Sequence, residues 1–319
     1  MISSLAVAKS APSHLPFADS STHLYVVRPT DSLYLNFYTP RTPRADHATV
    51  VYLYGGAFIN GDRNDRQTRL DAQALLNAGF AVAAVDYRKY FGTLNFDSVP
   101  KTKMLNHMDT AFSQAASDCA AAIAYLAAHA KQLGIDTSRI ILAGSSAGAI
   151  SVLQLDFARA NGLPVARELP SGWRPAAIAA YAGAIFNHHG PLAYAIPPAP
   201  TAFFYGETDR VVPFGFISLL SARYGGGECL SSVFHDNKYV YWTFRYPGHG
   251  HEVCGYLHRT IPEFTAFADA VLAGRHIHYN TECAADEFKI TPASKYTLMQ
   301  LLRNDSQVEG LFDDDRQQK

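Results

Sequence analysis

The chain has 319 residues, of which 48% are hydrophobic, and a formal net charge of −1. This length fits one large α/β domain or two small ones, and the apolar content is enough for a large core. A near-neutral chain without a basic tract lacks the charge pattern of nucleic-acid-binding proteins, and no apolar run reaches the roughly 18 residues of a membrane span. Residues 1–11 hold a short apolar patch interrupted by Lys9, without the basic start typical of a signal peptide.

The chain divides into a lead-in, a hairpin and an alternation of strands with helices. Residues 1–22, rich in Ser, Ala and Pro, are predicted to be a loose lead-in, and the short alternating runs 24–28 and 33–38 predict an antiparallel hairpin. Apolar runs typical of strands buried on both faces follow at 49–54, 80–87, 140–143, 176–182, 202–205 and 239–246. Helical patterns lie at 66–77, 109–133, 149–160, 214–224 and 257–272. This alternation predicts one α/β domain over 23–275, with a mostly parallel central sheet and helices on both faces.

Three segments do not fit the alternation. Residues 89–108 lack a regular pattern, and a stretch of that length inside a domain predicts a lid or a loop that lines a pocket. Its aromatic residues fit the core and a pocket wall equally well. Residues 183–200 predict another loop. Residues 276–319 are predicted to be a C-terminal extension with one helical candidate at 295–303.

The four cysteines leave the redox compartment open. None stands in a Cys-x-x-Cys pair, which argues against a zinc ribbon or a thioredoxin-type site. Cys119 lies in an Ala-rich helical stretch and is predicted to belong to the core. Cys229, Cys254 and Cys283 lie in the last third, where the spacing is compatible with one disulfide but assigns none.

The predicted strand at 140–143 runs into a Gly-x-Ser-x-Gly motif centred on Ser146, and a small-residue helical pattern follows. This motif between a strand and a helix is typical of a tight turn that exposes the hydroxyl of its central serine. Gly144 and Gly148 supply the small residues that such a turn requires. The unpaired N–H groups at the start of the new helix face whatever binds at Ser146. The motif therefore predicts a nucleophilic serine.

Serine is a weak nucleophile at neutral pH and needs a base, which a third group orients. In hydrolases with a serine at a strand–turn–helix, the acid and then the histidine follow the serine along the chain. Asp209 lies just after a predicted strand, with Glu207 as the alternative acid in the same loop. His249 and His251 lie in a glycine-rich loop after the last predicted strand. Because the carboxyl ends of parallel strands meet at one edge of the sheet, these groups are expected to approach Ser146.

The tetrahedral intermediate of ester cleavage needs N–H donors, each worth about 3–4 kcal/mol. One candidate is the N–H of Ala147, the residue after the serine. Others lie in the turn Gly55-Gly56-Ala57 after the first buried strand, where the absence of large side chains lets backbone N–H groups approach a ligand. We predict that Gly56, Ala57 and Ala147 form an oxyanion hole. This chemistry requires no metal or cofactor.

With these motifs, the segment from about 33 to 272 resembles the α/β-hydrolase superfamily, and within it the esterases related to hormone-sensitive lipase and the bacterial carboxylesterases. Tyr54-Gly55-Gly56-Ala57 is similar to the oxyanion loop of that family, and Asp86-Tyr87-Arg88 is similar to its Asp-Tyr-Arg strand end. Residues 134–148 are similar to its elbow region, which carries the nucleophilic serine. The run Tyr246-Pro247-Gly248-His249-Gly250-His251 is similar to its Pro-Gly-x-Gly-His ending. The resemblance implies the α/β-hydrolase fold and points to His251 rather than His249 as the base. Tyr54 replaces a histidine that braces the loop in the family, and Asp86 and Arg88 are expected to brace the loop from the neighbouring strand.

The resemblance implies a serine carboxylic-ester hydrolase that forms an acyl-enzyme, with Ser146, His251 and Asp209 as its triad. The family includes acetyl-xylan and feruloyl esterases, so the expected substrates are small short-acyl or aromatic-acyl esters, some of them carbohydrate-linked. Three alternatives use the same residues. They are a peptidase or amidase on this fold, a non-catalytic binding protein that keeps the fold, and a metal hydrolase built on the His-Gly-His-Glu run at 249–252, although no third ligand motif lies near that run.

Overall fold

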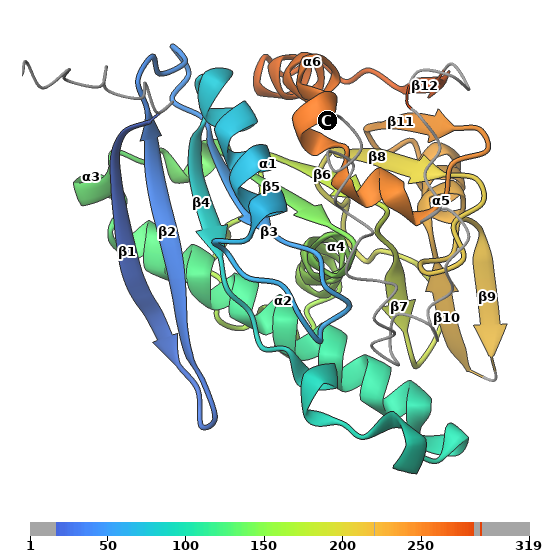
Figure 1. Ribbon diagram of the computed structural model, residues 1–319. Coiled ribbons are helices and arrows are strands. Elements are labelled where there is room, and N and C mark those ends of the chain that lie inside the picture. The colour runs from blue at the N-terminus through green and yellow to red at the C-terminus, as the bar shows by residue number, and fades with distance from the viewer. Residues whose placement is uncertain (1–16, 220, 284–287, 289–319) are drawn as a thin grey trace, which may run out of the picture.

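A computed structural model of the protein describes residues 17–219, 221–283 and 288. Within these residues, a nine-stranded sheet has the order β1-β2-β4-β3-β5-β6-β8-β11-β12 (Figure 1). Its parallel strands are β3 (Thr49–Leu53), β4 (Ala81–Val85), β5 (Ile140–Ser145), β6 (Ala177–Tyr181), β8 (Thr201–Gly206), β11 (Tyr241–Tyr246) and β12 (Tyr279–Glu282). The predicted hairpin is confirmed, because β1 (Phe17–Val27) and β2 (Ser32–Pro40) pair antiparallel with each other, and β2 also pairs antiparallel with β4.

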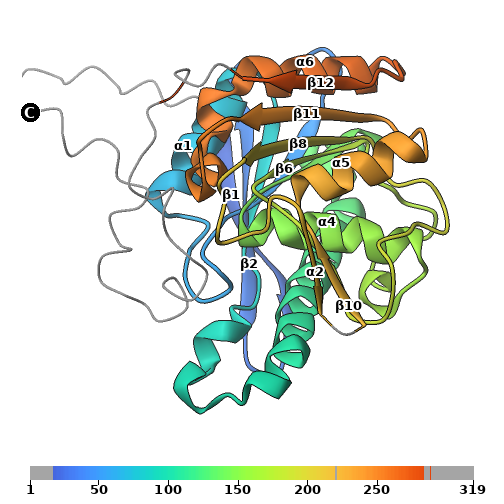
Figure 2. The same cartoon turned by 90° about the vertical axis from the view of Figure 1, so that its right-hand side faces the viewer.

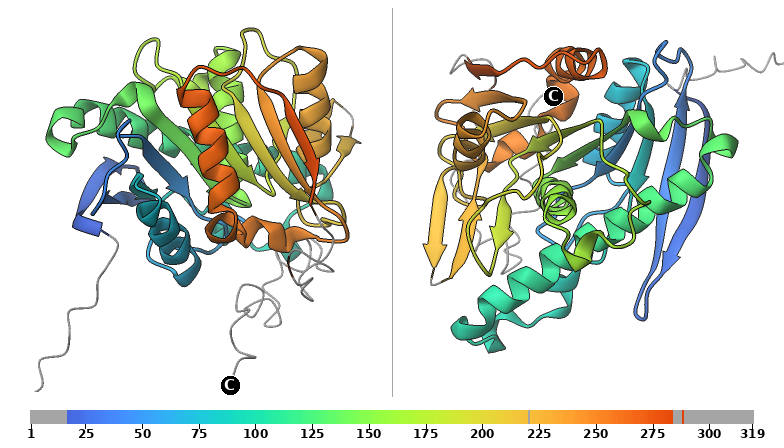
Figure 3. Two further views of the ribbon diagram at one scale, coloured as in Figure 1. Left: turned by 90° about the horizontal axis from the view of Figure 1, so that it is seen from above. Right: turned by 180° about the vertical axis from the view of Figure 1, so that it is seen from behind.

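Helices cover both faces of the sheet, so the predicted fold class is confirmed. On one face lie α1 (Arg66–Asn77) and α6 (Ile261–Leu272). On the other face lie α2 (Met104–Ala128), α4 (Ala147–Ala160) and α5 (Gly227–Asp236) (Figure 2). The short helix α3 (Ala130–Leu133) follows directly on α2, as the view from behind in Figure 3 shows. Among the described residues, no helix combines the length and apolarity that a membrane crossing requires.

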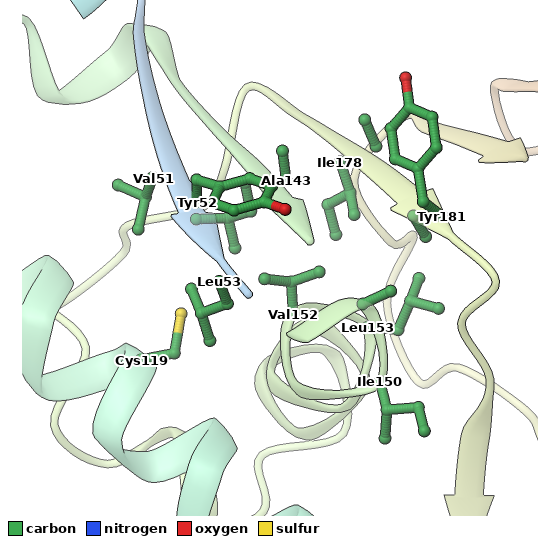
Figure 4. Close-up of a cluster of buried hydrophobic side chains, with 14 of the residues drawn as sticks. Val51, Tyr52, Leu53, Cys119, Ala143, Ile150, Val152, Leu153, Ile178 and Tyr181 are labelled. Carbon is green, nitrogen blue, oxygen red and sulfur yellow. The ribbon is translucent and has the colours of Figure 1, made fainter. Parts of the chain in front are cut away.

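The core is built on strands whose residues are buried on both faces, as the continuous apolar runs predict. Every residue of β3 and β5 is buried. Figure 4 shows Leu53 pointing toward Cys119 on α2 and Val152 on α4. Its neighbour Tyr52 faces the opposite way and donates its hydroxyl to Asp71 on α1 at 2.6 Å. Because each buried aliphatic side chain contributes about 1.5–3 kcal/mol, this core fixes the strand ends on which the candidate site is built.

The start of α1 shows how local chemistry sets the element boundaries. Asp65 precedes the helix in extended conformation, and its carboxylate accepts the N–H of Thr68 at 2.7 Å. This bond satisfies one of the N–H groups that a helix start leaves unpaired, and it confirms the predicted cap. Gly79 follows the helix with a φ of 87°, a left-handed conformation that favours glycine. The chain then turns into β4.

The helix predicted at 214–224 is wrong. This segment instead forms β9 (Phe216–Leu219) and β10 (Ala222–Gly225), which pair antiparallel in a separate three-stranded sheet. The third strand is β7 (Ile185–Asn187), inside the segment predicted to be loop. The apolar spacing of this segment fits a helix and a hairpin, and pairing with a distant strand selects the hairpin. Helix α5, which follows the hairpin, was not predicted.

Other boundaries also differ from the predictions. The segment 89–108 contains the 3₁₀ turns Tyr90–Thr93, Phe96–Ser98 and Lys101–Lys103, and α2 begins at Met104 rather than at 109. Strand β1 begins inside the predicted lead-in, and β12 lies inside the predicted C-terminal extension. The helical candidate at 295–303 lies outside the described residues. Among the described residues, no disulfide joins the four cysteines, and Cys119 is buried as predicted.

Candidate active site

Ser146 stands at a strained turn between β5 and α4. Its φ of 50° and ψ of −114° lie outside the regions that non-glycine residues favour. A Cβ atom on Gly148 would lie 2.0 Å from the carbonyl oxygen of Leu53, and one on Gly144 would lie 2.4 Å from the backbone of Gly148. Only glycine fits at either position, because α4 starts in direct contact with the end of β3 and the turn that follows it. The predicted strand–turn–helix is confirmed.

Three side chains from different strand ends meet at this turn. The hydroxyl of Ser146 lies 2.8 Å from Nε2 of His251, and Nδ1 of the same ring lies 2.8 Å from Oδ2 of Asp209. The other carboxylate oxygen, Oδ1, accepts the N–H groups of Val211 and Val212 at 2.8 and 3.0 Å. The Asp209 carboxylate is therefore held in one orientation, with its second oxygen directed at the ring. The structure brings together the three residues that the sequence singles out as candidates for a triad.

The alternative residues point elsewhere. Glu207 forms an ion pair with Arg245 on β11 at 2.8 Å. The ring of His249 is fully buried, and its Nδ1 lies 2.9 Å from the hydroxyl of Tyr256 and 3.2 Å from Glu252. Within the described ranges, no three His, Cys, Asp or Glu side chains are grouped so that they could hold a metal ion.

The turn after β3 lies against the serine. A Cβ atom on Gly55 would lie 3.3 Å from Cβ of Ser146, so the two backbones are in close approach. Gly56 has a φ of 133°, and Ala57 has a φ of 53°. In the described part of the chain, the amide N–H groups of these two residues make no hydrogen bond to another protein group. The first N–H of α4, from Ala147, is unpaired by helix geometry. Three N–H groups are thus available near the serine.

Aromatic stacking supports this turn at the position where the family that the sequence resembles has a histidine. Tyr54 is buried and stacks on Tyr87 from the end of β4, with ring centroids 4.7 Å apart. The hydroxyl of Tyr87 donates to the carbonyl oxygen of Tyr54 at 2.9 Å. Burial raises the pKa of both phenols, so both rings remain neutral and act by packing and hydrogen bonding.

Of the two residues after β4 that were expected to support the Gly55–Ala57 turn, Asp86 and Arg88, only Asp86 contacts the loop that continues from it. The carboxylate of Asp86 forms an ion pair with Arg63 in the loop that continues from the Gly55–Ala57 turn. Arg88 does not reach this loop. It binds the buried Asp118 on α2 at 2.9 Å instead, which ties the strand end to the helix beneath it.

A small apolar cavity opens beside the serine. Its volume is ≈ 80 Å³, and Ser146, Ala57 and Ala147 form one side of it. The remaining wall is apolar and consists of Phe58, Phe91, Met104, Met108, Phe112, Ile150, Val211, Val212 and Tyr224. The sequence left the aromatics of 89–108 open between the core and a pocket wall, and of these Phe91 lines the cavity. It missed Tyr224, because that segment was assigned to a helix, and it missed Val211 and Val212, although they lie only two and three residues after Asp209.

Two further contacts join the elements that carry the site. The hydroxyl of Ser145, next to the elbow serine, donates to the carbonyl oxygen of Cys254 at 2.6 Å. The hydroxyl of Thr208 donates to the carbonyl oxygen of His249 at 2.8 Å. The loop of Asp209 and the turn that contains His251 are therefore each hydrogen-bonded to a neighbouring part of the site.

Known proteins resemble parts of this chain in sequence. The BD-FAE family model matches residues 35–155, which include the Gly55–Ala57 turn and Ser146. Lipase 2 of Moraxella sp. (strain TA144) is 34% identical over 103 residues, which cover 32% of this chain and 20% of the lipase. The acetyl esterase of Salmonella paratyphi B is 29% identical over 140 residues, which cover 43% of this chain and 32% of the esterase. The matched segments span a fifth to a third of the length of these curated relatives.

Solved structures match over most of the chain. A truncated form of a carbohydrate esterase from gut microbiota aligns with a TM-score of 0.57 at 18% identity, over 82% of this chain and 100% of the other. An esterase of Thermogutta terrifontis with bound propionate aligns with a TM-score of 0.54 at 17% identity, over 80% and 96% of the two chains. At these identities the likeness establishes the fold, and the chain has the α/β-hydrolase fold.

Proposed function

We propose that this α/β-hydrolase-fold protein is a serine hydrolase of short-acyl carboxylic esters. The observation that carries the proposal is that Nε2 of His251 lies 2.8 Å from the hydroxyl of Ser146 while Nδ1 of the same ring lies 2.8 Å from Asp209. Beside them lie an apolar cavity and N–H groups that bond to no other group in the described part of the protein. The names of the relatives, an acetyl esterase and a lipase among them, support the same class of reaction.

The proposed mechanism follows from the hydrogen-bonding capacity of each group. The carboxylate of Asp209 accepts a hydrogen bond from the Nδ1–H of His251, so the neutral ring presents the lone pair of Nε2 to the hydroxyl of Ser146. As Oγ attacks the acyl carbon, its proton moves to Nε2, and the carboxylate stabilises the imidazolium. The N–H groups of Gly56, Ala57 and Ala147 hold the oxyanion, and each is worth about 3–4 kcal/mol.

The second half of the proposed reaction reverses these transfers. Collapse of the tetrahedral intermediate breaks the ester C–O bond, and the leaving alcohol takes the proton from Nε2 of His251. Water then gives a proton to Nε2 and attacks the acyl-enzyme carbonyl. The second collapse returns the proton to Oγ of Ser146 and releases the carboxylic acid.

The size of the cavity supports a short acyl group. A cavity of roughly 150 Å³ holds one benzene molecule. The cavity beside Ser146 has about half that volume, at ≈ 80 Å³, and fits an acyl chain of about two to four carbons. An aromatic acyl group is larger than this space, so we narrow the expected substrates to acetyl, propionyl and butyryl esters. The bound propionate of the Thermogutta terrifontis esterase is of this size class.

The test is hydrolysis of p-nitrophenyl acetate by the wild-type protein and by Ser146→Ala. Members of a triad act as a unit, so the substitution should lower kcat by about 10⁴-fold or more. Labelling of the wild type by a fluorophosphonate, and its loss in the variant, would identify Ser146 as the nucleophile. Turnover retained in Ser146→Ala would refute the proposal.

A further inference from the structure

Asp71 is a buried carboxylate that the proposed mechanism does not use. It lies on α1 with 0% of its surface exposed, and donors from three parts of the chain converge on it. The hydroxyl of Tyr52 on β3 donates at 2.6 Å, and Nε2 of Gln67 donates at 3.0 Å. The main-chain N–H and the ring Nδ1 of His258 lie at 3.0 and 3.1 Å. A buried carboxylate is costly unless it is hydrogen-bonded, and these donors compensate it.

The hydrogens of this cluster can be assigned by counting donors and acceptors. The Nε2 atom of Gln67 lies 3.0 Å from Oδ1 of Asp71 and 3.1 Å from the carbonyl oxygen of Gly255. These two oxygens account for both amide hydrogens of Gln67. The Nε2 atom of Gln67 also lies 3.1 Å from Nδ1 of His258, but it has no hydrogen left to donate to that nitrogen. Since Nε of Arg259 donates to Nε2 of the His258 ring at 3.5 Å, Nδ1 carries the ring hydrogen and donates it to Asp71. The cluster is fully satisfied in this arrangement, and it joins α1 to Gly255 and His258.

Gly255 and His258 belong to the segment that directly follows the base of the proposed reaction. Residues His251–Gly255 form one 3₁₀ turn, and Leu257–Arg259 form the next. Before this segment comes a glycine-rich loop in which Gly248 has a φ of 74°. The hydrogen bonds of a 3₁₀ turn have poorer geometry than those of an α-helix. The orientation of the His251 ring therefore also depends on contacts from outside the turn.

We infer that Asp71, through His258 and Gln67, is a positioning residue that fixes the turn carrying His251 in front of Ser146. This inference rests on the proposed function. Asp71 contacts no reacting atom. Its bond to Tyr52 also ties the same turn to β3, the strand that leads into the predicted oxyanion loop. A displacement of about 1 Å in a reacting group costs about 100-fold in rate, so the loss of this anchor should appear in kcat.

The experiment changes the ring of His258, because replacement of the buried Asp71 itself threatens folding. The side chain of His258 is 21% exposed and tolerates substitution better. His258→Leu removes the donor to Asp71, whereas His258→Asn keeps an N–H group at the position of Nδ1. With p-nitrophenyl acetate, we expect His258→Leu to lower kcat about 10- to 100-fold with KM within about twofold. We expect His258→Asn to restore kcat to within about threefold of wild type.

The control is His23→Leu, which removes a half-buried ring far from the strand ends of the site. His23 bonds to Ser21 at 2.7 Å and to Tyr125 at 3.0 Å, so its loss also removes two hydrogen bonds. We expect this variant to have a lower melting temperature and a wild-type kcat.

Three results would overturn the positioning role alone, provided that the wild type is active and Ser146→Ala is not. They are a wild-type kcat in His258→Leu, a kcat in His258→Asn as low as that in His258→Leu, and an equal loss of kcat in His23→Leu. A wild-type protein that neither hydrolyses esters nor reacts with a fluorophosphonate would instead refute the proposed function, and the positioning role would fall with it.

Discussion

Met108 offers a direct test of whether the cavity beside Ser146 holds the acyl group. The residue lies near the start of α2, is half-buried and forms part of the cavity wall. The substitution Met108→Ala removes the Cγ, Sδ and Cε atoms from that wall and lengthens the cavity. Because the side chain is only half-buried, we expect a loss of about 2 kcal/mol in the free energy of unfolding, at the low end for truncation of a methionine.

The size of the expected change follows from the cost of exposing apolar surface. Burial of one methylene contributes about 0.8 kcal/mol, and about 1.36 kcal/mol corresponds to a tenfold change in rate. Each methylene that the enlarged cavity accommodates should therefore raise kcat/KM about fourfold, and two should raise it about 15-fold. In the wild type, we expect kcat/KM to rise up to butyryl and to fall for longer chains, because the cavity of ≈ 80 Å³ is then full.

The assay compares p-nitrophenyl esters from acetyl to octanoyl, so that the leaving group stays constant and only the acyl chain varies. Met108→Ala should shift the maximum of kcat/KM from butyryl toward hexanoyl. The matched control is Leu105→Ala on the same helix, since Leu105 is also half-buried against the core but does not line the cavity. An unchanged chain-length profile in Met108→Ala, or the same shift in Leu105→Ala, would refute the assignment of the cavity to the acyl group.

Two further predictions concern stability. A Cβ atom on Gly148 would lie 2.0 Å from a backbone oxygen, so Gly148→Ala should lower the free energy of unfolding, measured in urea, by about 3 kcal/mol or more. The control is Gly190→Ala, because a Cβ atom there would have its nearest neighbour at 3.8 Å. This control should change the free energy of unfolding by less than about 1 kcal/mol. Equal effects would contradict the close approach of the elbow to β3. Burial raises the pKa of Glu252 in the folded protein above the usual value of about 4.3. The folded state is therefore stabilised by protonation of Glu252 below about pH 4.3, and this stabilisation is lost as the pH rises through the higher pKa of the folded state. The stability of Glu252→Gln relative to wild type should therefore be greater at pH 8 than at pH 4 in urea unfolding, and the opposite order would contradict this sign.

The sequence was most informative where the signal is local. A buried strand is a continuous apolar run, and the elbow needs glycines on either side of Ser146, so both can be recognised from a few neighbouring residues. Asp209 lies three residues after the end of a strand, so it is expected at the carboxyl edge of the sheet with the serine. These features predicted the fold class and the three side chains that meet in the structure.

Long-range contacts determine what the sequence did not reveal. The apolar spacing of residues 214–224 fits a helix, and only pairing with β7 selects the hairpin that brings Tyr224 to the cavity. The direction of the His249 ring is set by Tyr256 and Glu252, which the pattern around a glycine-rich loop does not indicate. The role inferred for Asp71 depends on contacts that join residues nearly 190 positions apart in the chain.

The layout of the site separates the groups proposed for catalysis from those that shape the cavity. Ser146, Asp209 and His251 stand at or just after the carboxyl ends of β5, β8 and β11. Much of the cavity wall comes from outside the sheet, because Met104 and Met108 lie at the start of α2 and Tyr224 lies in the separate hairpin. A change in these wall segments can therefore alter the volume beside the serine without moving the strand ends. For this reason, we expect acyl preference to vary more readily than the chemistry of the hydrolytic step.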